Sequence, residues 1–363
     1  MKDLIVVGLG QAWTKFYKEV VAKMERLNKI RLLGTVDPAF AVNAKVELAN
    51  DKWHVQTVQD IPKNLIKPET IVMILTPDHY SIIENLANMG FKYILCEKPL
   101  VSRRNEIEKL LNLTNLYDIR IYAIDFYLPK TLGLQVVRGL LTRNDPRYEH
   151  LDISHPEADF NMMLGEIEGV ALQVIEAGSF CLPDIAGRPY LVQNREMGGM
   201  ILDLITHVCG PLYQSRLLDD YRVLDVSLSR LSGITSGYLV PIADISTEVE
   251  IYITALLEAN GIPVHLSFGK VPIAKGGIWA LEIRGKNGMY YAGLRTGQPA
   301  ILVSNSGDIV TFSLKTSTYE FVVREALLHF DGLLPGFDGN HGAFSTSMEV
   351  GRAIIGKYDE SVS

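Results

Sequence analysis

The chain has 363 residues, of which 47% are hydrophobic and 21% charged, and this is typical of a folded globular protein with two domains. A net charge of −7 without any basic run argues against nucleic acid as a partner. No apolar run reaches the length of about 18 residues that spans a membrane, and the N-terminus has a strand-like run instead of a signal peptide. Three widely spaced cysteines without metal-ligand spacing predict a cytoplasmic protein with no metal site.

Short apolar runs alternate with helical patterns over residues 1–125. Strands are expected at residues 4–7, 30–36, 71–75, 93–96 and 119–124, and a helix at residues 81–89. The helix after the first strand is expected to bury four apolar residues that recur at helical spacing, namely Phe16, Val20, Met24 and Leu27. Continuously apolar strands separated by helices form a parallel sheet covered on both faces. Residues 1–125 are therefore predicted to be an α/β domain with the doubly wound fold that binds dinucleotides.

After about residue 125 the apolar pattern becomes alternating. Residues 248–258 place apolar side chains on one side and polar ones on the other, and hairpins are expected around Asn287-Gly288 and Ser306-Gly307. A further strand is expected at residues 264–268, and a helix at residues 343–357. Residues 126–363 are therefore predicted to be an α+β domain whose antiparallel sheet has one face open or covered by a partner. The cleft between the two domains is the expected active site.

A glycine turn follows the first strand. Gly8 permits the tight turn, and Gly10 lets the backbone approach a pyrophosphate at the N-terminus of the next helix. Trp13 stands where a third small residue is usual, so the helix is expected to be displaced or its first turn rotated, which need not abolish binding. An ordinary glycine turn after a strand is the alternative interpretation. The cofactor-binding residues expected in this turn are Gly8, Gly10, Gln11, Ala12 and Trp13.

Asp37 ends the second strand, where an acidic side chain accepts hydrogen bonds from the ribose hydroxyls of a dinucleotide. A carboxylate at this place repels the 2′-phosphate of NADP, and no Arg or Lys follows it in the next few residues. The sequence therefore favours NAD over NADP. An exposed aspartate in a turn before Pro38 is the alternative interpretation.

Two further motifs carry residues suited to acid–base chemistry. Lys98, in Glu97-Lys98-Pro99, follows a strand of the predicted sheet and lies at the edge where the cofactor binds; the alternative is a surface lysine. Asp203 and His207 are four residues apart, so a helix places both on one face. A histidine is the natural base for a hydroxyl proton near neutral pH. The alternative is a structural pair that stabilises the helix.

The stretches "CEKPL", "GGMILDLITH" and "TPDHY" together resemble the glucose–fructose oxidoreductase, inositol dehydrogenase and rhizopine-catabolism (Gfo/Idh/MocA) family of NAD(P)-dependent oxidoreductases. The resemblance implies a Rossmann domain followed by a domain with a large, mostly antiparallel open sheet. It implies hydride transfer at a secondary alcohol or ketone of a sugar, cyclitol or similar compound. Lys98 and His207 then flank the reacting carbinol, and Asp203 assists.

The same resemblance assigns further cofactor contacts to Thr76, Pro77, His79, Glu97 and Lys98. This chain departs from the family pattern at Met197, where a glycine is usual, and at Ser81, where a histidine is usual. These departures affect the prediction of the substrate more than that of the cofactor.

A fainter resemblance concerns "IDFYLPK", which is similar to a motif of glucose-6-phosphate dehydrogenases that contributes to a sugar-phosphate site. Tyr127 and Lys130 of this stretch are candidates for substrate binding; the alternative is a packing tyrosine and a surface lysine. Arg195, before the glycine pair, is a candidate for holding a phosphate or a carboxylate.

Three functions remain open at this point. The first is an NAD(P)-dependent sugar oxidoreductase, in which Tyr127 is the rival of His207 as the base. The second is a sugar-phosphate dehydrogenase, and the third is a non-catalytic NAD(P)-binding sensor on the same fold. The chain is expected to form a homodimer or homotetramer through its C-terminal sheet.

Overall fold

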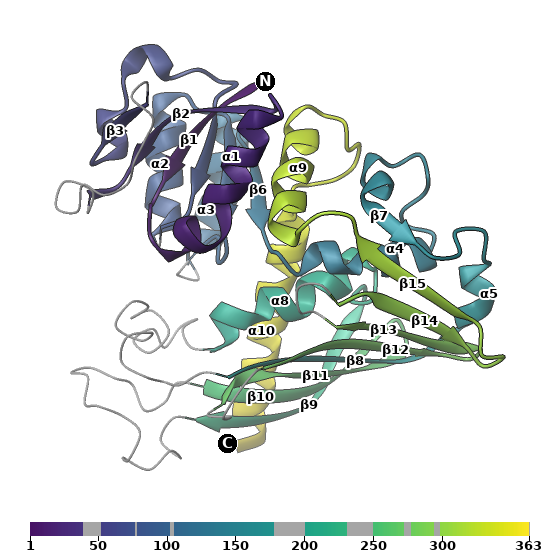
Figure 1. Ribbon diagram of the computed structural model, residues 1–363. Coiled ribbons are helices and arrows are strands. Elements are labelled where there is room, and N and C mark those ends of the chain that lie inside the picture. Colours follow the sequence, from purple (N-terminus) through teal and green to yellow (C-terminus); the bar gives the residue numbers. More distant parts are fainter. Residues whose placement is uncertain are drawn as a thin grey trace. The chain divides into compact units, whose positions relative to one another are not determined.

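The computed structural model describes residues 1–38, 52–76, 78–101, 105–177, 200–230, 250–271, 277–293 and 298–362 (Figure 1). The chain divides into two compact units. The first unit comprises Met1–Ile124 and Val322–His341, and the second comprises Asp125–Phe321 and Gly342–Ser363. The segment Val322–His341, which the predicted boundary at residue 125 assigns to the second domain, thus packs with the first unit.

The first unit is built on a six-stranded parallel sheet with the order β3-β2-β1-β4-β5-β6. Its strands are β1 (Lys2–Val7), β2 (Ile30–Val36), β3 (Trp53–Val55), β4 (Ile71–Ile74), β5 (Tyr93–Glu97) and β6 (Arg120–Ile124). Its helices include α1 (Lys18–Arg26), α2 (His79–Met89) and α3 (Asn105–Tyr117). The strand order reverses between β1 and β4, which is the topological switch point where doubly wound sheets bind ligands. The predicted α/β fold is confirmed.

The expected apolar face of the first helix is wrong at two positions. Phe16 and Leu27, predicted to face the core, are 40% and 46% exposed. A π-helical turn, Trp13–Tyr17, precedes α1, and its wider turn rotates the side chains relative to a regular α-helix. Trp13 and Tyr17 are buried instead. The bulky Trp13 is therefore accommodated by a changed first turn of the helix.

The segment Val322–His341 packs with the first unit through several polar and aromatic contacts. The Tyr122 hydroxyl donates a hydrogen bond to Glu325 Oε2 over 2.5 Å, and both side chains are buried. The ring of Tyr93 stacks on that of Phe330, with 5.0 Å between their centroids. Contacts of this kind between distant parts of the chain make the first unit discontinuous in sequence.

The second unit contains a nine-stranded sheet with the order β7-β15-β14-β13-β12-β8-β11-β10-β9. Its strands are β7 (Leu151–Ile153), β8 (Ile167–Ala177), β9 (Tyr221–Arg230), β10 (Glu250–Ala259), β11 (Ile262–Val271), β12 (Ile278–Gly285), β13 (Gly288–Gly293), β14 (Ala300–Ser304) and β15 (Ile309–Leu314). Only β8 and β11 pair in parallel among these described strands. The predicted mostly antiparallel sheet and both predicted hairpins, β12–β13 and β14–β15, are confirmed.

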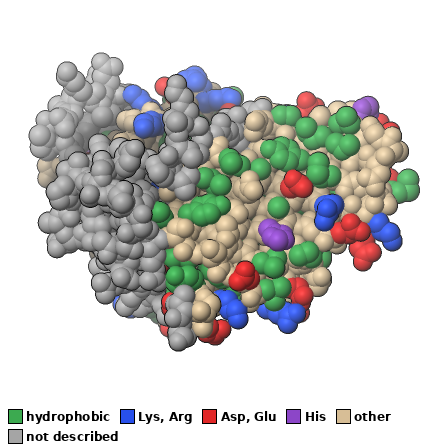
Figure 2. Space-filling model, turned by 90° about the horizontal axis from the view of Figure 1, so that it is seen from below, with side chains coloured by type: hydrophobic (Ala, Val, Ile, Leu, Met, Phe, Trp, Pro, Cys, Tyr) green, Lys and Arg blue, Asp and Glu red, His purple; other side chains and the backbone are tan. Residues whose placement is uncertain are grey.

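The two faces of this sheet differ in composition. One row across the strands joins Leu281, Leu172 and Leu266, which are all buried. Helix α8 (Met200–Gln214) packs over β8, β10 and β11 (Figure 1). The adjacent row, through Glu282 and His265, is exposed, because successive residues of a strand point to opposite faces. Figure 2 shows this open face, where apolar side chains lie among polar ones over its described part.

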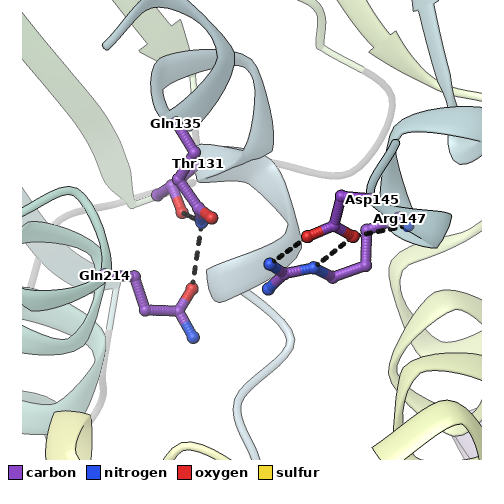
Figure 3. A network of polar contacts seen from close by, with 5 residues as sticks. All are labelled: Thr131, Gln135, Asp145, Arg147 and Gln214. Carbon is purple, nitrogen blue, oxygen red and sulfur yellow. Dashed lines mark hydrogen bonds and ion pairs between the residues drawn. The ribbon is translucent and has the colours of Figure 1, made fainter. Parts of the chain in front are cut away.

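Polar contacts hold the segment after β6 against α8. This segment forms a 3-10 turn, Leu128–Thr131, and the short helix α4 (Leu132–Val137). The Gln135 amide donates hydrogen bonds to Thr131 Oγ1 at 3.4 Å and to Gln214 Oε1 at 3.3 Å (Figure 3). Gln214 ends α8, so these bonds tie α4 to the helix that carries the predicted catalytic pair.

Candidate functional site

The glycine turn brings the ends of β1 and β4 close together. Gly8 has a φ of +94°, and a Cβ atom on it would lie 2.9 Å from both the Cβ and the backbone nitrogen of Thr76. Its N–H donates a hydrogen bond to the carbonyl of Val36 over 2.8 Å. A side chain at this position is therefore excluded both by backbone conformation and by space.

Asp37 lies against the same turn. The N–H of Leu9 donates a hydrogen bond to Asp37 Oδ2 over 2.6 Å. Gly10 and Gln11 are exposed, and nothing lies within 4 Å of the place where a Cβ on Gly10 would be. The open backbone at Gly10 and the carboxylate beside it suit the pyrophosphate and the ribose of a dinucleotide. These residues therefore fit the cofactor that the fold implies.

The helix that follows this turn also contributes to the structure of the predicted cofactor site. Ala12 is half-buried, and Trp13 is buried, with its indole Nε1 lacking a hydrogen-bond partner among the described residues. The Tyr17 hydroxyl donates to Glu97 Oε1 over 2.7 Å, and the Lys98 N–H donates to Glu97 Oε2 over 3.0 Å. Glu97 therefore fixes the backbone at Lys98 relative to the first helix.

Thr76 and His79 lie at the end of β4 and the start of α2, whereas Pro77 lies outside the described residues. His79 Nδ1 donates a hydrogen bond to the carbonyl of Pro99 over 2.5 Å. Burial lowers the pKa of His79 to about 4. His79 is thus a neutral, buried side chain that links α2 to the segment carrying Lys98.

In the second unit, α8 carries Asp203 and His207, and both are 1% exposed. His207 Nδ1 donates a hydrogen bond to Asp125 Oδ2 over 2.8 Å. Asp125 is also buried, and its Oδ1 accepts from the N–H of Tyr127 over 2.9 Å. With Nδ1 acting as the donor to a carboxylate, the neutral imidazole has Nε2 as its acceptor.

Three aromatic rings surround this imidazole. Tyr127 meets His207 edge-on at 4.6 Å between centroids, Phe126 lies at 5.4 Å, and Trp279 lies at 6.3 Å. Tyr127 in turn stacks on Trp279 at 4.4 Å. This apolar surrounding strengthens the charge–dipole interactions of the pair, because the local dielectric constant is low.

Asp203 has a different partner. Its Oδ2 forms an ion pair with Lys270 Nζ from β11, and the same amine lies 3.2 Å from Glu176 Oε2 of β8. Asp203 and Lys270 are largely buried, so each compensates the desolvation of the other's charge. The carboxylate that holds His207 Nδ1 is therefore that of Asp125, although Asp203 lies four residues before His207 on the same helix.

Sequence reasoning missed Asp125 and Lys270. Asp125 belongs to the quoted stretch "IDFYLPK" and follows β6 directly, so its place at a strand end was a usable signal. Lys270 lies in a strand with no recognisable motif, and nothing in the sequence pointed to it. Arg195 and the glycine pair Gly198-Gly199 lie outside the described residues.

The side chains of Tyr127 and Lys130 lie in different surroundings. Their backbones are linked, because the Lys130 N–H donates a hydrogen bond to the Tyr127 carbonyl. Burial raises the pKa of the Tyr127 hydroxyl well above its ordinary value, and the charges of Glu176 and Asp125 raise it further. Lys130 lines a separate pocket, to which neither Tyr127 nor His207 contributes.

No group of three or more His, Cys, Asp or Glu side chains within the described residues is arranged to hold a metal ion. None of the described helices combines the length and the apolar character needed to cross a membrane.

The switch-point turn, the acidic residue at the end of β2 and the six-stranded parallel sheet define a dinucleotide-binding domain. Residues 2–122 match the Gfo/Idh/MocA family, described as "Oxidoreductase family, NAD-binding Rossmann fold". The N-terminal domain therefore belongs to this oxidoreductase family, which confirms the resemblance seen in the sequence. No curated protein matches the chain in sequence.

Solved structures share the fold over nearly the whole chain. A dehydrogenase (MviM) from Clostridium difficile has a TM-score of 0.66 at 14% identity, over 98% of this chain and 99% of that one. KijD10, a 3-ketoreductase from Actinomadura kijaniata solved with NADP and TDP-benzene, has a TM-score of 0.66 at 14% identity, over 96% and 95%. An oxidoreductase from Agrobacterium radiobacter, solved with NAD+, L-tartaric acid and magnesium, has a TM-score of 0.63 at 14% identity, over 98% and 96%. At this identity the similarity shows the fold.

Acid should weaken the first unit through His79. Its pKa of about 4 lies below the unfolded value of 6.5, so its contribution to stability is present above pH 6.5 and is lost as the pH falls towards 4. Between pH 7 and pH 4.5 the free energy of unfolding should fall by about 2 kcal/mol because of His79. The His79→Asn variant keeps a donor in place of Nδ1–H but does not titrate, so its free energy of unfolding should not show this decrease. Urea denaturation at both pH values measures it.

The exposed His155 provides the matched control, because His155→Asn should follow the pH dependence of the unmodified protein. Equal pH dependence of the His79→Asn variant and the unmodified protein would contradict the assignment of His79 as a buried neutral group.

Proposed function

We propose that this protein is an NAD(P)-dependent oxidoreductase that transfers hydride between a nicotinamide cofactor and a secondary alcohol or ketone of a sugar, cyclitol or sugar derivative. The observation that carries the proposal is the buried Asp125–His207 pair on a fold with a dinucleotide-binding turn. The family match over residues 2–122 supports the redox class, and the 3-ketoreductase activity named for KijD10, which has the same fold, supports a ketone or secondary alcohol as the reacting group.

His207 is the proposed base. Because Asp125 accepts from Nδ1, Nε2 is the atom that takes the hydroxyl proton of the substrate, and the Asp125 carboxylate stabilises the imidazolium that forms. The chemistry that a nicotinamide cofactor supplies when bound is hydride transfer to or from the same carbon. Lys98 keeps the role assigned from the sequence, as the charged donor that stabilises negative charge on the substrate oxygen.

Tyr127 is the weaker candidate for the base. Burial and the neighbouring Glu176 and Asp125 raise the pKa of its hydroxyl, so its phenolate is disfavoured near neutral pH. Its edge-on contact with His207 instead suits a residue that holds the imidazole and contacts the substrate. The charge of Asp203 is balanced by Lys270, and we propose that Asp203 contacts a substrate hydroxyl. Arg195 is proposed to hold an anionic substituent of the substrate.

Turnover provides the direct test. His207→Ala and Lys98→Ala should each lose at least ~100-fold in turnover, because proton-transfer groups contribute ~10²–10⁴-fold. His207→Ala should still bind NAD normally. Asp125→Asn should lose a similar factor, because an amide can donate to Nδ1 and so impose the wrong tautomer. A panel of sugars, cyclitols and sugar phosphates, screened by nicotinamide absorbance, identifies the substrate for these measurements.

His155, an exposed histidine of the second unit, is the control, and His155→Ala should keep full turnover. The assignment fails if Tyr127→Phe abolishes turnover while His207→Ala retains more than about a tenth of it.

Cofactor preference is proposed to rest on Asp37. Its carboxylate lies against the glycine turn, so the 2′-phosphate of NADP would meet a like charge there. NAD should therefore bind more tightly than NADP. The Asp37→Ser variant should show a smaller difference in affinity between the two cofactors, as measured by fluorescence titration. Asp60→Ser, at an exposed aspartate of the same unit, should leave the difference unchanged. Tenfold tighter binding of NADP by the unmodified protein would show that Asp37 does not select the cofactor.

We also propose that the chain forms a homodimer or homotetramer through the open face of the nine-stranded sheet. Exposed apolar residues on this face support it: Ile278, Met289, Tyr291 and Ile309. Such a patch on a folded protein is typical of a site of association.

Sedimentation at micromolar concentration should give a dimer or a tetramer, and Tyr291→Lys should shift the distribution towards the monomer. Leu111→Lys, at an apolar residue of α3 that is 43% exposed against 38% for Tyr291, is the matched control and should leave the assembly intact. A monomeric unmodified protein would refute the proposal.

A further inference from the structure

A pocket of about 190 Å³ lies in the second unit, lined by the 3-10 turn, the ends of β13 and β15 and the start of α9 (Thr318–Phe330). Its polar lining includes Lys130, Thr316, Ser317 and Thr318. None of the residues around His207 contributes to it: Asp125, Phe126, Tyr127, Asp203 and Trp279 are all absent from its wall. The pocket is therefore a cavity of its own.

Three buried polar atoms in this wall have no hydrogen-bond partner in the part of the chain that the structure describes. They are Lys130 Nζ, Thr316 Oγ1 and Thr318 Oγ1. Thr318 is only 3% exposed, so its hydroxyl is withdrawn from solvent. Buried polar groups without partners cost free energy, and several in one cavity indicate that a ligand or ordered water completes them.

The charge at Lys130 is also uncompensated by the described residues. Burial lowers the pKa of its amine to about 8, and no carboxylate of the described part of the chain opposes that shift. This contrasts with Lys270, whose amine pairs with Asp203 and Glu176. An amine in such a cavity attracts an anion, because the anion restores the stability of its charged form.

The start of α9 adds a second source of positive potential. Ser317 Oγ accepts a hydrogen bond from the N–H of Glu320, which is the N-cap arrangement, so α9 begins at the wall of the pocket, where Ser317 and Thr318 lie. A helix N-terminus favours anions. Glu320 lies in the same turn, but it is not part of the pocket wall.

We propose that this pocket binds a small oxyanion, held by Lys130 Nζ and the hydroxyls of Thr316 and Thr318. The site is smaller than the cavities of about 300–1,000 Å³ that hold drug-sized ligands, and it suits a phosphate or a short carboxylate. Binding there involves no cofactor and none of the residues of the proposed hydride-transfer chemistry. The inference therefore stands apart from the proposed function.

Calorimetric titration of the full chain with inorganic phosphate, in an oxyanion-free buffer without cofactor, tests the site. The unmodified protein should bind one phosphate per chain. Lys130→Met and Thr318→Val, which keep the shape of each side chain, should weaken the affinity at least tenfold. Lys286→Met, at an exposed lysine of the β12–β13 turn, is the matched control and should bind as the unmodified protein does. A parallel titration with acetate compares the affinity of the pocket for a carboxylate with its affinity for phosphate.

Both variants should fold, because Lys130→Met removes an unpartnered buried amine and Thr318→Val replaces an unpartnered hydroxyl. A thermal unfolding curve in the same buffer checks this. The proposal is overturned if neither phosphate nor acetate binds, or if a folded Lys130→Met variant binds phosphate with unchanged affinity. It is also overturned if Lys286→Met weakens binding as much as Lys130→Met does.

Discussion

The hydrogen bond between Asp125 Oδ2 and His207 Nδ1 joins the first residue of the second unit to the middle of helix α8. Both side chains are buried, and an ionised carboxylate is tolerated there only because the imidazole and the Tyr127 N–H bind its oxygens. Tyr127 then follows in a fixed position beside the imidazole. The geometry of the candidate site thus depends on one aspartate that directly follows β6 in the chain.

The fold was accessible from the sequence because periodicity is a local property. Strands buried on both faces, such as Ile71–Ile74, appear as continuous apolar runs, and β10 appears as an alternating one. The glycine turn and Asp37 were likewise recognisable, because a phosphate-binding turn imposes its residue types over a short stretch. Trp13 predicted a rotated first turn of the helix, and the structure has a π-helical turn at Trp13–Tyr17. The exposure of Phe16 and Leu27 was not predicted, because the prediction rested on the period of a regular α-helix.

The site was accessible only in part. Spacing along a helix correctly placed Asp203 and His207 on α8, but it could not reveal which charge each one meets. His207 meets a residue 82 positions away and Asp203 one that is 67 positions away. Partners at such separations are chosen by the tertiary fold, and the sequence contains no pattern that encodes them. The burial of Lys130 without a partner among the described residues could not be predicted for the same reason, because only packing decides whether a lysine is buried without a counter-ion.

The contribution of Val322–His341 to the first unit has a consequence for synthesis on the ribosome. Strand β6 is the last strand of its sheet, and the Ala123 N–H donates to the carbonyl of Gly339 over 2.9 Å, while the Asn340 amide donates to the Ala123 carbonyl over 2.8 Å. A nascent chain presents all six strands of this sheet long before residue 339 is made. Until then the edge of β6 lacks these partners, and such an edge can pair with another chain. Because the chain is synthesised from its N-terminus, the edge of β6 stays without these partners from the time it emerges until residues 339 and 340 have been made.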